Sequence, residues 1–225
     1  MENKIFVDNL DDLTVKQISS GQNGKCYMTK DNMVFKYINN PDELNLRKLS
    51  KFYSSHFIFP RVLVYSNEGK ILGYIMEYAK GDTLSKLPEF VSFEKYSNEI
   101  ERIEREIEVL TCYRLRLIDM GINNMIYSEE NGIRVIDTDF YKPKNKSKSL
   151  YLANMTSFAY GAMYPITDIS EPNFKNEKLN KYSSQTISGR MKPSNFMYEL
   201  LKESNKNGFE KPESLKEFSK QLKLL

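Results

Sequence analysis

The chain has 225 residues with 33 basic and 30 acidic side chains, so its net charge of +3 gives no overall signal for nucleic acid or an anionic membrane. One histidine and two widely separated cysteines exclude histidine-rich metal sites and fit no cysteine spacing typical of zinc sites. Because no stretch approaches the roughly 20 apolar residues of a membrane span and the N-terminus shows no signal-peptide pattern, we expect a soluble, cytoplasmic protein.

Three strands are expected over residues 14–20, 25–29 and 33–38, because the sequence alternates within these segments and turn residues separate them. The loop between the first two strands contains Gly21 and Gly24. Glycines allow the backbone to approach a ligand, and the backbone amides of such a loop can bind phosphate oxygens. The alternative is an ordinary hairpin turn.

Lys36 is the one cation on the third expected strand. An apolar strand that directs a lysine toward the glycine loop suits binding of α- and β-phosphates, whereas most lysines face solvent. A helix should follow, with Asn40 as its N-cap, Pro41 in the first position and Glu43 in the first turn. Glu43 is the last acidic residue before Glu68, so it is our candidate for the ion partner of Lys36; the alternative is a glutamate that only caps the helix.

Residues 61–78 are expected to form two further strands joined by a turn at residues 67–69, which completes an antiparallel set of five. Gly81 breaks the pattern, and Asp82 is expected to cap a helix. A long helix should run from Phe93 to about Leu117, because apolar residues recur there every three or four positions. We expect it to pack on its own domain; a two-heptad coiled coil is the alternative.

The long helix leads to a group of oxygen-bearing side chains. Asp119 lies five residues before Asn124, and Asp137 directly follows a short apolar strand at residues 133–136. Phosphoryl transfer needs such a set, because one carboxylate accepts a hydroxyl proton while an amide and a second carboxylate hold magnesium on the phosphates. Asp139 is the alternative to Asp137, since counting residues alone allows a shifted register.

The last third of the sequence carries less specific signals. Four lysines in residues 142–148 suit a solvated loop or a short activation segment, and no aromatic residues interleave them as in a nucleic-acid-binding surface. Helices are expected over residues 151–166, 194–205 and 212–224, and an irregular segment over residues 167–193.

The order of these features resembles the catalytic core of the protein-kinase-like superfamily: glycine loop, strand lysine, helix glutamate, hinge, long helix, D-x-x-x-x-N and a final aspartate. The resemblance covers roughly residues 13–141. It implies an α+β fold in a single two-lobed domain. The N-lobe would be a five-stranded antiparallel sheet over about residues 1–79, and the C-lobe would be mainly helical over about residues 82–225.

The resemblance also implies ATP and Mg²⁺ as cofactors. The stretch before Gly81 resembles a kinase hinge, where main-chain groups meet the adenine. The residues thereby expected to bind the nucleotide are Gly21, Gly24, Lys36, Glu43, Glu77 and Ala79. Asp119 would be the catalytic base, Lys36 would act with it on the phosphates, and Asn124 and Asp137 would hold the metal.

Several positions depart from the kinase pattern. Leu117 and Ile118 replace its His-Arg pair, Gly121 stands where serine/threonine kinases carry a lysine, and Asp139 replaces the glycine of D-F-G. The implied activity is transfer of the γ-phosphoryl group to a hydroxyl, with protein serine or threonine as the expected acceptor. The alternatives are a small-molecule kinase of the aminoglycoside-kinase type and a nucleotide-binding pseudokinase that acts as an interaction module. We expect no nucleic-acid or membrane partner.

Overall fold

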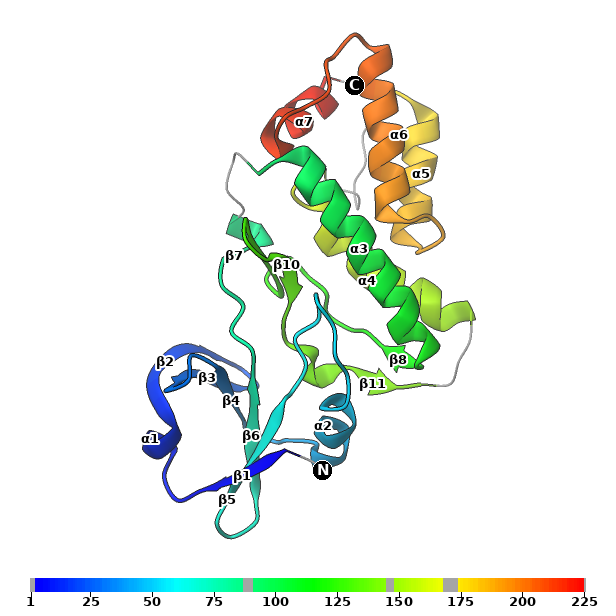
Figure 1. The fold of residues 1–225 in the computed structure, drawn as a ribbon. Helices are drawn as coiled ribbons and strands as arrows, with labels where there is room; N and C mark the ends of the chain where they lie inside the picture. Colours follow the sequence, from blue (N-terminus) through cyan, green and yellow to red (C-terminus); the bar gives the residue numbers. More distant parts are fainter. Residues whose placement is uncertain (1–2, 87–90, 145–147, 168–173, 225) are drawn as a thin grey trace. The chain divides into compact units, whose positions relative to one another are not determined.

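The computed structural model describes residues 3–86, 91–144, 148–167 and 174–224 (Figure 1). Over these residues the chain is an α+β protein with one six-stranded sheet, two small sheets and seven α-helices. It divides into two compact units, residues 1–79 with 136–140 and residues 80–135 with 141–225. The sequence does not predict the return of residues 136–140 to the first unit. None of the described helices is long and apolar enough to cross a membrane.

The first unit is built on a sheet with the strand order β1-β5-β6-β4-β3-β2. Its elements in chain order are β1 (Lys4–Val7), α1 (Leu10–Leu13), β2 (Thr14–Gly21), β3 (Gly24–Thr29), β4 (Val34–Ile38), α2 (Glu43–Leu49), β5 (Val62–Ser66), β6 (Ile71–Met76) and the 3-10 helix η2 (Thr138–Phe140). The five strands expected from the sequence are present as β2 to β6, and they pair antiparallel.

The expected total of five strands is wrong, because β1 adds a sixth strand at the edge of the sheet. β1 runs parallel to β5, with Lys4 paired with Leu63. A strand of four residues carries little periodic signal of its own. Its place in the sheet depends on a partner that lies far away in the sequence.

Neighbouring residues of a strand point to opposite faces of a sheet. Phe35 therefore lies on one face with Ile75, in an apolar cluster to which α1 also contributes. Lys36 lies on the other face, directly opposite Tyr74 of β6. One strand thus supplies an apolar side chain to the core and, next to it, a cation to the candidate site.

Helix α2 begins later than the sequence predicts. Asp42 is its N-cap instead of Asn40, because the Asp42 carboxylate accepts a hydrogen bond from the amide of Asn45 at 3.0 Å. A carboxylate at this position satisfies a backbone amide that the first helical turn leaves without a partner. Leu46 and Leu49 then face the interior of the unit.

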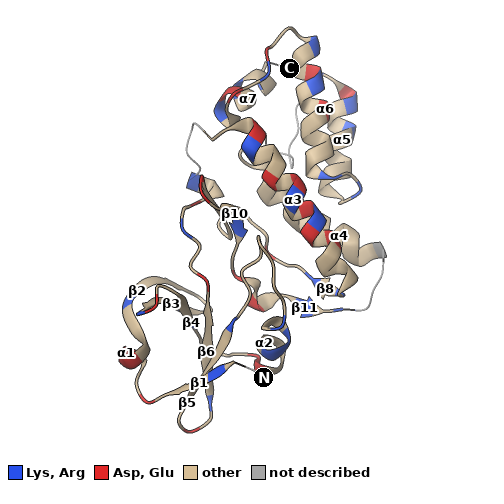
Figure 2. Cartoon of the chain, viewed as in Figure 1, with Lys and Arg blue, Asp and Glu red and all other residues tan. Residues whose placement is uncertain are grey.

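The second unit contains the other helices and five short strands. Its elements in chain order are β7 (Asp82–Thr83), the 3-10 helix η1 (Leu84–Lys86), α3 (Phe93–Cys112), β8 (Leu115–Arg116), β9 (Met125–Ser128), β10 (Gly132–Val135), β11 (Lys142–Pro143), α4 (Lys148–Met163), α5 (Glu177–Ile187), α6 (Pro193–Lys206) and α7 (Leu215–Leu222). Helix α3 packs against α4, α6 and α7. Acidic and basic residues are interspersed along α3 (Figure 2), while Tyr96, Ile100, Ile103, Ile107 and Leu110 form its buried apolar stripe. A helix packed on its own domain is therefore the correct interpretation.

Helix α3 ends at Cys112 and does not continue to Leu117. Arg114 has a positive φ of 63°, a conformation that cannot continue a right-handed helix. The chain then forms β8, which pairs with β11.

Two further expectations for this unit are wrong. Asp82 does not cap a helix; it lies in β7 and pairs with Tyr127 of β9. Residues 167–193, expected to be irregular, contain α5, whose N-cap is Asn176. The residues that α5 buries are Leu179, Ser183 and Thr186, so apolar residues alone do not mark its buried face.

Glu104 is a buried carboxylate that joins α3 to the start of α6. One of its oxygens accepts a hydrogen bond from the amide of Ser194 at 2.8 Å, and the other accepts from the Ser194 hydroxyl at 2.6 Å. Burial raises the pKa of Glu104 above its ordinary value of 4.5, against the opposing effect of the Ser194 hydrogen bonds. Its stabilising contribution is therefore complete below about pH 4.5 and is lost as the pH rises through the folded-state pKa.

We expect Glu104→Gln to remove this part of the pH dependence of stability. The measurement is the free energy of unfolding from urea titrations at several pH values between 4 and 8. The difference in the free energy of unfolding between wild type and variant should change with pH. The wild type should lose stability relative to the variant as the pH rises. Glu68→Gln, the same substitution at an exposed turn position of the first unit, is the control. A difference that does not vary with pH would contradict the assignment.

Candidate functional site

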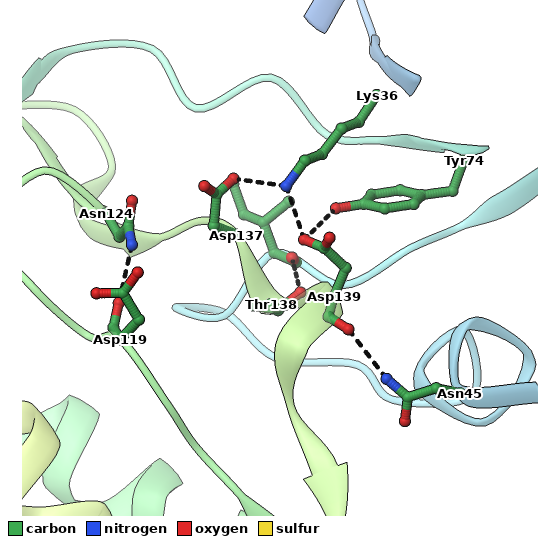
Figure 3. Close-up of polar contacts among 9 residues, drawn as sticks. Lys36, Asn45, Tyr74, Asp119, Asn124, Asp137, Thr138 and Asp139 are labelled. Atoms are coloured by element: carbon green, nitrogen blue, oxygen red, sulfur yellow. Dashed lines mark hydrogen bonds and ion pairs between the residues drawn. The ribbon is translucent and has the colours of Figure 1, made fainter. Parts of the chain in front are cut away.

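Lys36 on β4 is a buried cation that contacts two carboxylates from a distant part of the chain. Its Nζ lies 3.1 Å from Asp137 Oδ1 and 2.8 Å from Asp139 Oδ1 (Figure 3). Only 6% of its side chain is exposed. The interpretation of Lys36 as a solvent-facing lysine is therefore wrong. Lys36 and Asp137, two of the residues selected from the sequence, meet within the first unit.

The two carboxylates keep Lys36 charged. Burial by itself lowers the pKa of a lysine, because it removes water from the cation. Here the charges and hydrogen bonds of Asp139 and Asp137 outweigh burial, and the pKa of Lys36 is raised above its ordinary value. Lys36 therefore remains a cation at neutral pH.

Asp137 and Asp139 have different surroundings. The side chain of Asp139 is 5% exposed, and its Oδ1 also accepts a hydrogen bond from the Tyr74 hydroxyl at 3.0 Å. Burial and then the charge of Asp139 raise the pKa of Tyr74 well above its ordinary value, so the phenol stays protonated and donates. The side chain of Asp137 is 36% exposed and thus accessible to a ligand from solvent.

The segment that carries both aspartates is fixed by the rest of the first unit. The hydroxyl of the fully buried Thr138 donates to the carbonyl of Ile58 at 2.6 Å. On α2, Asn45 donates through Nδ2 to the main-chain oxygen of Asp139 at 2.9 Å. These bonds hold η2 beneath the face of the sheet that carries Lys36, and neither Thr138 nor Asn45 was selected from the sequence.

The predicted ion pair between Lys36 and Glu43 is not formed. Glu43 instead accepts hydrogen bonds from Arg47 at 2.8 Å and from the Tyr65 hydroxyl at 3.0 Å. These two bonds, Arg47 first, lower the pKa of Glu43. Glu43 lies in the first turn of α2, and its side chain contacts Arg47 in the next turn of the same helix. The distance in sequence between Lys36 and Glu43 could not by itself exclude an ion pair between them.

The glycine loop is a tight hairpin between β2 and β3. Gly21 pairs with Gly24, and only Gln22 and Asn23 lie between them. A Cβ atom on Gly24 would lie 1.9 Å from the carbonyl oxygen of Tyr37, so Gly24 is required by the close approach of β4. Gly21 has no such constraint, because a Cβ there would meet nothing within 4 Å. The geometry is that of a hairpin turn, and a role in nucleotide binding stays a prediction for both glycines.

Glu77 and Ala79 follow β6 at the end of the first unit. The Glu77 carboxylate forms an ion pair with Arg61 at 2.9 Å, and the Arg61 guanidinium lies 4.3 Å from the centre of the Tyr53 ring. Ala79 is 7% exposed. The Glu77 side chain thus has a structural partner, and the predicted nucleotide contacts concern the main chain of both residues.

In the second unit, Asp119 and Asn124 lie in one loop between β8 and β9. Asn124 Nδ2 donates to the main-chain oxygen of Asp119 at 2.9 Å (Figure 3), and its backbone amide donates to Gly121 at 2.9 Å. The Asp119 residue is exposed. The Nδ2 of Asn124 thus helps to close the loop. Because this hydrogen bond fixes the side-chain amide, it also fixes the direction of the amide oxygen.

Asp119 and Asp137 share an uncommon backbone conformation. Their φ angles are 57° and 58°, and only Asn32 and Arg114 among the other described non-glycine residues have a positive φ. Such angles are rare outside glycine, although aspartate adopts them more readily than most residues. Strained backbone concentrates at functional sites, where it orients a side chain. Both aspartates selected from the sequence have this feature, and Asp139 does not.

Helix α4 holds the Asp119 loop through residues that the sequence analysis missed. The fully buried Asn154 accepts a hydrogen bond from the amide of Leu117 at 2.9 Å and donates to Thr111 and to the carbonyl of Leu115, each at 2.9 Å. Gly161 lets the loop approach, because a Cβ there would lie 2.4 Å from the Met120 carbonyl oxygen. A polar residue and a glycine within an apolar helix were the available signals.

We expect Asn154→Ala to destabilise the protein by about 2–4 kcal/mol, since each buried backbone or hydroxyl group left without a partner costs about 1–3 kcal/mol. The measurement is urea unfolding. The matched control is Asn195→Ala on α6, at an exposed position, which should change stability by less than about 0.5 kcal/mol. Equal effects of the two substitutions would show that the Asn154 hydrogen bonds contribute nothing particular.

Each of the two residues predicted as metal ligands carries an oxygen of a type that magnesium binds. Among the described residues, no three His, Cys, Asp or Glu side chains form a group that could hold a metal ion. Magnesium does not need such a group, because it binds one or two protein oxygens and completes its shell with water and substrate phosphates. Asp137 in the first unit offers a partly exposed carboxylate, and Asn124 in the second unit offers an amide oxygen. Both are ligand types that magnesium prefers.

Comparison with models of known protein families found no match, and comparison with curated proteins found no significant match.

Proposed function

We propose that the protein is a protein-kinase-like phosphotransferase that moves the γ-phosphoryl group of ATP to a hydroxyl acceptor. One observation carries the proposal. A lysine on a central strand is buried and charged, and it is held by a carboxylate 101 residues further along the chain. A buried cation is costly unless it is paired, and a lysine paired with carboxylates that could also hold a metal ion suits nucleotide phosphates.

Each residue has a specific role in this proposal. Lys36 binds the α- and β-phosphates, and Asn124 and Asp137 are the magnesium ligands. Bound magnesium would neutralise charge on the β- and γ-phosphates. Asp119 accepts the proton of the acceptor hydroxyl as its oxygen attacks the γ-phosphorus. The bond from the γ-phosphorus to the bridging oxygen breaks, and ADP leaves.

The acceptor is proposed to be a protein serine or threonine. The absence of the kinase His-Arg pair before Asp119 argues against control by a phosphorylated loop through that arginine. Gly121, in place of the kinase lysine, leaves the transferred group to be neutralised by the metal or by another cation.

The test is transfer of labelled phosphate from ATP to a panel of proteins, the protein itself, and small alcohols including aminoglycosides. Thermal melting with and without ATP and magnesium accompanies it, and Asp119→Asn serves as the blank. Transfer to a protein hydroxyl that the blank lacks supports the proposal. Transfer to small alcohols alone identifies a small-molecule kinase. ATP binding without transfer to any acceptor identifies a pseudokinase and overturns the proposed activity.

A further inference from the structure

Lys36 has two carboxylate neighbours, and the shorter contact is not to the aspartate proposed as metal ligand. Nζ lies 2.8 Å from Asp139 and 3.1 Å from Asp137. The departure from the D-F-G pattern at Asp139 has no role in the proposed reaction described above. The structure therefore raises the question of what a second, buried carboxylate does there.

Asp139 is enclosed on several sides. Its Oδ1 accepts hydrogen bonds from both Lys36 and Tyr74, which lie directly opposite each other on β4 and β6. Its main-chain oxygen accepts from Asn45 of α2. A carboxylate with 5% exposure and two charged or phenolic donors has little room for an ion that keeps several of its waters. Asp137, at 36% exposure, has that room.

The residue first expected to hold Lys36 is occupied elsewhere. Glu43 bonds to Arg47 and Tyr65, and its side chain is 40% exposed. The contribution of α2 to this cluster is made through Asn45, which fixes the backbone at Asp139.

Resting on the proposed function, we infer that Asp139 is the positioning residue that holds Lys36 for the nucleotide phosphates, with Tyr74 orienting its carboxylate, and that Asp137 is the metal ligand of the pair. Asp139 keeps Lys36 in place when Asp137 turns its carboxylate toward a divalent cation. Asp139, which lies in η2 and accepts from Tyr74 of β6, already pairs with Lys36, so this ion pair does not depend on Glu43 of α2.

The first part of the test separates the two aspartates by their effect on metal-assisted binding. ATP affinity is measured by calorimetry in EDTA and in magnesium for wild type, Asp137→Asn and Asp139→Asn. We expect magnesium to tighten binding to wild type and to Asp139→Asn by factors that agree within about twofold, and to have little effect on Asp137→Asn. Loss of the magnesium effect in Asp139→Asn, alone or together with Asp137→Asn, would overturn the assignment.

The second part tests whether Asp139 acts through Lys36. A double-mutant cycle combines Asp139→Asn with Lys36→Met and measures ATP affinity and, where transfer occurs, kcat. The effect of Asp139→Asn should largely disappear once Lys36 is gone, with a coupling on the order of fivefold. Asp42→Asn is the matched control, because asparagine also caps a helix well, and it should show no coupling. Tyr74→Phe is the milder variant if Asp139→Asn does not fold, and its effect should also depend on Lys36.

Additive effects of positions 36 and 139, or coupling of Lys36 to Glu43→Gln instead, would overturn the inference while the proposed function stands. A folded wild type that binds no ATP would overturn the proposed function and this inference with it.

Discussion

Asp119→Asn is expected to lower phosphoryl transfer by roughly 10²- to 10⁴-fold while ATP affinity and melting temperature stay near the wild-type values. The reason is that an amide cannot accept the acceptor's proton. Asparagine also tolerates the positive φ of 57° at this position, so the loop should keep its shape. The measurements are a transfer assay, an ATP titration and a melting curve on the same protein.

The control for Asp119→Asn is Asp31→Asn, the same substitution at an exposed turn position. It should leave transfer, binding and stability unchanged. A structural Asp119 would behave differently, because its loss would lower the melting temperature and weaken ATP binding together. That outcome would remove Asp119 from the catalytic assignment.

Asp137→Asn is expected to reduce magnesium-dependent transfer by on the order of 10²- to 10³-fold, the usual cost of losing one group that stabilises charge in the transition state. The fold should remain, because asparagine again suits the observed φ of 58° and the side chain is 36% exposed. The measurement is turnover as a function of magnesium concentration, with melting curves to verify folding.

The comparison with Asp139→Asn decides which of the two aspartates is the metal ligand. If Asp137→Asn retains near-normal turnover and its magnesium dependence while Asp139→Asn loses both, then Asp139 is the metal ligand. Asp42→Asn again provides the control, since it changes a carboxylate of the first unit at a helix cap.

The sequence alone predicted most of the elements near the candidate site. Alternation at residues 14–38 and 61–78 predicts strands, and β2 to β6 are found there. The helical period after Phe93 predicts α3. These predictions succeed because the periods of strands and helices are local properties of the chain. This signal is missing from β1, which is short, and from α5, whose buried face includes Ser183 and Thr186.

Local sequence patterns also identified the candidate residues, but they did not identify the contacts that these residues make. Lys36, Asp119, Asn124 and Asp137 were selected by residue type and spacing. The structure shows that Asp119 and Asp137 share a positive φ, which no spacing reveals.

The partner of Lys36 was decided only by the tertiary structure. Glu43 is seven positions away in the sequence and was the nearer acidic candidate, yet its carboxylate bonds to Arg47 and Tyr65. Asp139 is 103 positions away and lies against Lys36 because η2 packs with the first unit. Asn154 and Gly161 likewise gain their roles from the approach of α4 to the Asp119 loop. Long-range packing brings such groups together, and a local periodic pattern contains no information about which distant segment will arrive.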